Sequence, residues 1–198
     1  MTTQRAYHHG NLRQALLEAA ERTVRERGAG DLSLRELARE VGVSHGAPRR
    51  HFPDRQALLD ALAEAGFERL GSELREALRE AGPGFVGRLH AMAAAYVRFA
   101  VDDSTLLELM FAGKHREGAA ALEQAAEQAF SPIMELIEQG QAERFLEPGD
   151  PERIGLVLFA TVQGIASLVT GQMVRADQVG ELLADSIAHF LRGSRGVA

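Results

Sequence analysis

The 198-residue chain contains no cysteine, so disulfide bonds and thiolate metal sites are excluded. Its N-terminus lacks the apolar core of about 7–15 residues that a secretory signal peptide needs. No apolar run reaches the roughly 18 residues of a membrane span, because Gln163, Gly164 and Gly171 interrupt the longest candidate, 156–174. These absences predict a soluble protein of the reducing cytoplasm with no membrane partner.

Segments with the alternating, β-branched pattern of strands are also absent, so we expect an all-α fold. Helical periodicity, caps and breaks predict nine helices, with Asn11, Asp54 and Asp150 as expected caps. Three form a head at residues 1–55, which begins with an arm at 1–10, and six form a body at 56–198. The head helices are expected near 11–27, 33–41 and 45–51, and the body helices near 54–81, 85–101, 104–112, 117–142, 151–174 and 177–192.

Patterns of catalytic and metal-binding chemistry are missing as well. The sequence has neither the paired Glu-x-x-His motifs of di-iron bundles nor an HExxH zinc motif. Residues 82–87 satisfy GxGxxG, but they follow a predicted helix rather than a strand, so we interpret them as a loop and not as a dinucleotide site. We therefore expect no enzyme, no cofactor and no metal site.

Charge is distributed unevenly along the chain, whose net charge is −6. Residues 1–55 carry ten arginines and seven acidic residues, whereas residues 56–198 carry 12 basic and 21 acidic residues. A basic head on an acidic body indicates that the head faces phosphate.

Residues 33–42 have the pattern of a short helix that ends in a tight turn. Ser33 and Glu36 have the spacing of a capping box. Gly42 is the residue type that takes positive φ where a helix stops. The apolar face between them consists of Leu34, Leu37, Ala38 and Val41.

The next segment, 45–51, is predicted to be a second short helix with few apolar side chains. It carries Arg49, Arg50 and His51, and these cationic groups indicate contacts with phosphates and base edges. Two helices of this kind form a helix-turn-helix, whose second helix lies in the DNA major groove. The alternative is an ordinary helical hairpin whose arginines are solvated.

The N-terminal part of the chain resembles the N-terminal domain of the TetR family of transcriptional regulators. The resemblance is carried by the segments 11–27 and 33–51 and by the stretch HFPDRQALLDAL. The resemblance covers about the first 60 residues, and it implies a helix-turn-helix head on a helical body, bound to an operator in double-stranded DNA. The expected DNA-binding residues are Ser33, Arg35, Ser44, His45, Gly46, Ala47, Arg49, Arg50, His51 and Arg55.

One residue of the segment 45–51 departs from the family's usual pattern. Arg49 stands where a tyrosine that touches the DNA backbone is common, and arginine can make the same contact as a charge-assisted hydrogen bond. Pro48 removes an amide and is expected to shorten or distort the first turn of the helix.

The helix expected at 151–174 is apolar around most of its circumference, which is typical of a helix buried on more than one side. The resemblance implies that the two C-terminal helices of each subunit form a four-helix homodimer interface. A monomer with one central buried helix is the alternative. A dimer would also place two recognition helices about one DNA turn apart on a palindrome.

Soft and aromatic side chains in the body could line a cavity, although such a set more often forms a plain core. The resemblance implies a pocket for a small-molecule effector. The candidate ligand-binding residues are Met92, Tyr96, Phe99, Met110, Phe111, Phe130, Met134, Phe159 and Gln163.

The function expected from these patterns is that of a homodimeric, ligand-responsive transcriptional regulator. Its simplest form is a repressor that a small molecule releases from its operator. The alternative is a helical ligand-binding or protein-interaction module that does not bind DNA.

Overall fold

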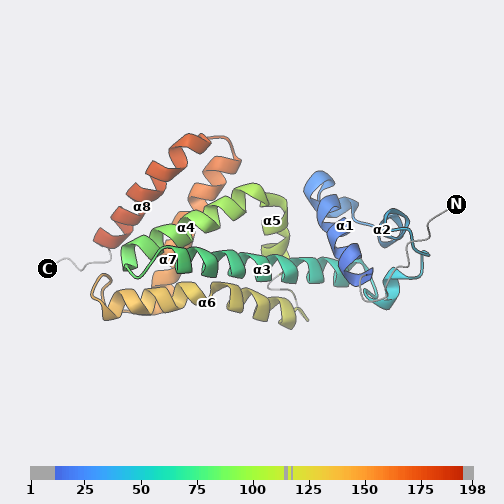
Figure 1. The fold of residues 1–198 in the computed structure, drawn as a ribbon, viewed down its shortest axis with the longest axis horizontal. Coiled ribbons are helices and arrows are strands. Elements are labelled where there is room, and N and C mark those ends of the chain that lie inside the picture. The colour runs from blue at the N-terminus through green and yellow to red at the C-terminus, as the bar shows by residue number, and fades with distance from the viewer. Residues whose placement is uncertain (1–11, 114–115, 117, 194–198) are drawn as a thin grey trace. The chain divides into compact units, whose positions relative to one another are not determined.

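The computed structural model describes residues 12–113, 116 and 118–193, and Figure 1 shows the order of its helices. Within these ranges there are eight α-helices, three short 3-10 turns and no strand, which confirms the all-α fold. The expected arm at 1–10 and a cap at Asn11 lie outside the described residues. The elements are α1 (Leu12–Arg27), η1 (Ala29–Asp31), α2 (Leu34–Glu40), η2 (Pro48–Arg50), α3 (Arg55–Glu80), α4 (Phe85–Asp102), α5 (Ser104–Gly113), α6 (Ala120–Ala142), α7 (Pro151–Thr170), η3 (Ala176–Gln178) and α8 (Val179–Gly193).

The structure differs from the predicted nine helices at residues 45–51, which form turns and the single 3-10 turn η2 instead of an α-helix. A second proline behaves differently, because Pro132 lies inside α6 without ending it.

Two predicted caps hold long helices. The Asp54 carboxylate accepts the Ala57 amide of α3 at 2.8 Å, and Asp150 accepts the Glu152 amide of α7 at 3.0 Å.

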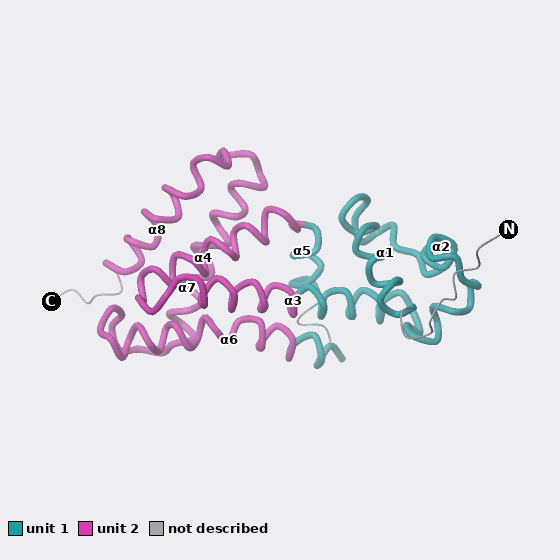
Figure 2. Tube along the Cα trace, viewed as in Figure 1, with its two compact units in different colours: residues 1–66, 105–123 teal, residues 67–104, 124–198 magenta. Residues whose placement is uncertain are grey.

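The chain divides into two compact units, which Figure 2 draws in different colours. Unit 1 comprises Met1–Gly66 and Thr105–Glu123, and unit 2 comprises Phe67–Ser104 and Gln124–Ala198. Helices α3 and α6 therefore each contribute residues to both units.

The core of unit 1 forms where α1 packs against α2 and η2. Its helices also approach closely at Gly66 of α3, where an added Cβ would lie 2.7 Å from the Met110 sulfur of α5. The Asp60 carboxylate forms an ion pair with Arg116. The side chains buried in the head part of this core include Leu16, Leu17, Ala20, Val24, Leu37, Ala38, Phe52 and Leu58.

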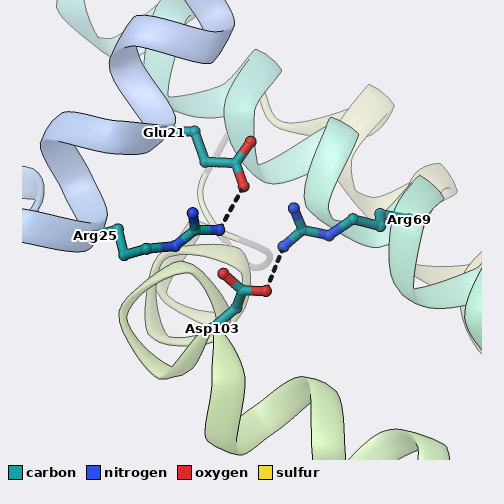
Figure 3. A network of polar contacts seen from close by, with 4 residues as sticks. All are labelled: Glu21, Arg25, Arg69 and Asp103. Carbon is teal, nitrogen blue, oxygen red and sulfur yellow. Dashed lines mark hydrogen bonds and ion pairs between the residues drawn. The ribbon is translucent and has the colours of Figure 1, made fainter.

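Unit 2 is built on α4, which packs against both α7 and α8. Leu89, Ala95 and Ile187 lie in its core. Figure 3 shows one ion pair from each unit: Arg69 binds Asp103 at 2.8 Å in unit 2, and Arg25 binds Glu21 at 3.0 Å in unit 1.

Helix α7 is long and apolar enough to cross a membrane by length and composition alone, with a mean hydropathy of 1.6. Such a helix also occurs in proteins that meet no membrane. Only 28% of its apolar window is buried within the chain, so much of this helix faces outward.

Candidate nucleic-acid interface

Helix α2 begins at Ser33, which is the N-cap residue by backbone geometry, with φ −134° and ψ 122°. The Ser33 carbonyl accepts the Leu37 amide at 3.0 Å. The predicted capping box is wrong in one respect, because the Ser33 hydroxyl makes no capping hydrogen bond. Ser33 therefore contributes to the start of the helix through its backbone carbonyl, and its half-buried hydroxyl is not committed to an α2 amide.

The turn after α2 is a Schellman motif centred on Gly42. Gly42 has φ +74°, which confirms its predicted role as the residue with positive φ. The Val43 amide donates to the Ala38 carbonyl at 2.9 Å, and the Gly42 amide donates to the Arg39 carbonyl at 3.3 Å. These two bonds satisfy carbonyls that α2 would otherwise leave unpaired at its end. The turn therefore fixes the direction in which the chain enters the recognition segment, residues 44–51.

The recognition segment folds as two successive tight turns. The Ala47 amide donates to the Ser44 carbonyl at 2.9 Å. In η2, the Arg50 amide donates to the Ala47 carbonyl at 3.2 Å, and the His51 amide donates to the Pro48 carbonyl at 3.0 Å. These bonds span three residues, as in a 3-10 helix, whereas α-helical bonds span four.

The side chains of the recognition segment separate into an inner and an outer set. Pro48 is buried, while Arg49 and Arg50 are exposed. Neither guanidinium makes a hydrogen bond or an ion pair with another residue that the structure describes. Both charges are thus available to phosphates or base edges.

Other predicted DNA-binding residues precede or follow these two arginines in the sequence, and most of them are exposed. Arg35, in the first turn of α2, is exposed. Ser44, His45 and Gly46 are exposed, and Ala47 and His51 are half-buried.

The Arg55 side chain makes intramolecular hydrogen bonds that the sequence did not indicate. Its Nε donates to the Leu32 carbonyl at 3.0 Å, and its Nη2 donates to the carbonyls of Ala29 and Gly30. The guanidinium therefore fastens the start of α3 to the loop between α1 and α2. The acceptors are backbone carbonyls, which leave no signal in the sequence.

Two more arginines that sequence reasoning missed hold the head together. Arg22 of α1 forms an ion pair with Glu40 of α2 at 2.7 Å. The Arg13 guanidinium lies 5.5 Å from the centre of the Phe52 ring, within the range of a cation–π interaction. These contacts join α1 to α2 and to Phe52.

In unit 2, part of the predicted ligand set meets around a small cavity. Met92 and Tyr96 of α4 and Phe159 of α7 line it, and its volume is about 20 Å³. Known ligand pockets measure roughly 300–1,000 Å³, so side chains fill most of this region. The remaining lining residues are Ala93, Ile133, Leu158 and Val162.

A polar pair lies at this apolar region. The Tyr96 hydroxyl donates to Gln163 Oε1. Burial raises the pKa of the Tyr96 phenol above its ordinary value, so the hydroxyl keeps its proton and remains a donor. The Phe159 ring meets both Tyr96 and Phe130 edge-on, with ring centres 5.5 Å apart in each pair.

The remaining predicted ligand residues lie elsewhere. Met110 and Phe111 belong to α5 in unit 1. The Phe99 ring packs against Arg69, whose guanidinium carbon lies 5.1 Å from the ring centre. Met134 of α6 lies near Gly155, where an added Cβ would meet its sulfur at 3.4 Å. Residue type alone could not separate these core positions from the cavity.

Comparison with known proteins assigns both parts of the chain. Residues 16–62 match the family model for bacterial regulatory proteins of the tetR family, and residues 89–191 match the tetracyclin repressor-like C-terminal domain. The HTH-type transcriptional repressor Rv1474c of Mycobacterium tuberculosis is 32% identical over 168 residues, which cover 81% of this chain and 85% of that protein.

Solved structures show the same fold. A Rhodococcus sp. RHA1 protein of unknown function is 45% identical, with a TM-score of 0.90, and the match covers 98% of this chain and 100% of that one. A bacterial regulatory protein of the tetR family from Rhodococcus RHA1 shares the fold at 17% identity, with a TM-score of 0.73 over 94% of this chain and 98% of that one. The chain therefore belongs to the TetR family and is a helix-turn-helix DNA-binding transcriptional regulator, not an enzyme.

Proposed function

We propose that this regulator is a homodimeric repressor, which a small molecule releases from a palindromic operator in the cytoplasm. In this proposal residues 1–55 bind DNA, and residues 56–198 bind the effector and form the dimer. The observation that carries the proposal is an exposed apolar face on α7, which needs a partner.

This face follows the helical period of α7. Leu156 is 65% exposed, Val157 is 54% exposed and Leu168 is 36% exposed. Ala160 and Gly164 lie on the same face and are also exposed, and they are small enough to let a second helix approach. A continuous apolar stripe of this kind marks an interaction site. We propose that the α7 and α8 helices of two protomers cover it in a twofold-symmetric interface.

A dimer is also what the recognition segment requires. A single short segment buries little surface on DNA, whereas two segments on the half-sites of a palindrome give useful affinity. Dimerisation and operator binding are therefore linked in this proposal.

For the effector, we propose a mainly apolar molecule with a polar group that meets Tyr96 and Gln163. Their hydrogen bond is partly buried beside the Phe159 ring, so a ligand that enters must open the small cavity and replace that bond. Such a molecule releases the operator only if it binds the two states of the protein with unequal affinity. The residues proposed for this site are those of unit 2 at the small cavity: Met92, Tyr96, Phe130, Phe159 and Gln163.

Loss of the Tyr96 hydroxyl is expected to weaken the effector response without weakening DNA binding. Effectors can be found by screening small apolar acids, amides and alcohols for release of a fluorescent operator. In Tyr96→Phe, the concentration needed for release should rise about tenfold, because one hydrogen bond of about 1–1.5 kcal/mol is lost. Gln163→Leu should act in the same direction. Equal release curves for wild type and both variants would place the effector elsewhere.

A further inference from the structure

We propose that Pro48 is a specificity-determining residue, which holds the recognition segment in 3-10 turns and so decides which operator sequence the protein reads. This inference rests on the proposed role of residues 44–51 in DNA binding. It assigns a function to a buried residue that itself carries no charge and no hydrogen-bond donor.

The first step is the bond that Pro48 cannot make. An α-helix that starts at His45 needs an amide at position 48 to donate to the Ser44 carbonyl. Proline has no amide hydrogen, so this bond is absent whatever the surroundings. The Ser44 carbonyl accepts the Ala47 amide at 2.9 Å instead, which closes a tighter turn.

The second step is the position of the proline ring. Pro48 is buried, so the ring is fixed against the head and cannot turn outward. Successive residues of a 3-10 turn project about 120° apart. With Pro48 pointing inward, Arg49 and Arg50 project to opposite sides of the outer surface, and both are exposed.

The third step is the effect on the residues that precede the proline. Ser44, His45 and Gly46 are exposed in a turn and are not part of a helical first turn. Base recognition depends on where each donor and acceptor meets the groove edge. A change in backbone shape at these residues therefore changes which bases they reach, while the number of positive charges stays the same.

The test replaces Pro48 with alanine, which restores an amide at this position. The full-length protein and Pro48→Ala are each used to select binding sites from random DNA duplexes. We expect Pro48→Ala to select a different consensus and to bind the wild-type consensus at least tenfold more weakly. Its affinity for non-specific duplex DNA and the salt dependence of that affinity should stay within about twofold, because both follow the unchanged charge. Amide and carbon chemical shifts of residues 45–51 should move toward α-helical values.

Two further variants control for altered packing. Pro48→Leu restores the amide while keeping an apolar side chain of larger volume, and we expect it to shift the consensus as Pro48→Ala does. Pro53→Ala removes an exposed proline of the same unit and should leave the consensus unchanged. Thermal unfolding of each variant shows whether the head remains folded.

The outcomes separate this inference from the proposed function. If wild type and both Pro48 variants select the same consensus with equal affinity, Pro48 does not determine specificity. If the wild-type protein selects no sequence, DNA binding by residues 44–51 is itself contradicted, and the inference falls with it.

Discussion

Replacement of Arg50 by alanine is expected to remove specific operator binding and to leave the fold and the proposed dimer unchanged. Arg50 is exposed and makes no hydrogen bond or ion pair within the described part of the chain, so the free protein loses no contact. On DNA, each subunit loses a charge-assisted contact of roughly 1.5–3 kcal/mol. Two subunits on one palindrome therefore lose about 3–6 kcal/mol, or at least a hundredfold in affinity.

Fluorescence anisotropy with a labelled operator measures this loss. The matched control is Arg98→Ala, which removes an exposed arginine from α4 in unit 2 and should bind the operator as wild type does. Thermal unfolding and light scattering check that both variants remain folded dimers. An Arg50→Ala protein with unchanged operator affinity would contradict the assignment of the recognition segment.

A charge placed on the exposed face of α7 is expected to dissociate the dimer and to abolish operator binding as a consequence. Leu156 is 65% exposed in the protomer, so Leu156→Arg leaves the protomer core unchanged. In a symmetric interface the variant would bury two unpaired guanidinium groups, each at a cost of several kcal/mol. Light scattering should report a monomer, circular dichroism should report wild-type helix content, and operator affinity should fall at least a hundredfold.

The control for this variant is Val86→Arg. Val86 is an apolar residue of α4 that is 37% exposed and lies outside the proposed interface. We expect this variant to remain a dimer with wild-type operator affinity. A Leu156→Arg protein that stays dimeric would show that α7 is not the interface.

The parts of the structure that sequence reasoning predicted are those that depend on local chemistry. Gly42 takes positive φ because a helix end requires it, and glycine is the residue that adopts it most readily. Asp54 and Asp150 cap α3 and α7 because a carboxylate can reach amides two or three residues further along. Each of these features is determined by neighbours in the sequence.

The features that sequence reasoning missed depend on distant partners or on the extent of a local distortion. Arg55 binds carbonyls that lie more than 20 residues earlier in the chain. Met110 and Met92 look alike in the sequence, yet they belong to different units. The predicted helix at 45–51 is absent. The sequence indicated only a shortened or distorted first turn at Pro48, and the extent of the 3-10 turns became visible only with the hydrogen bonds.

The central claim is that the exposed arginines of the recognition segment bind a specific operator in a dimer. An electrophoretic mobility shift with the full-length protein and DNA from upstream of its own gene, with competitor DNA and a salt series, tests it most directly. The account predicts a specific complex whose affinity falls steeply and linearly with the logarithm of salt concentration, because several phosphate contacts release counterions. An affinity that does not change with salt, or no specific complex with this fragment or with any site selected from random duplexes, would contradict it.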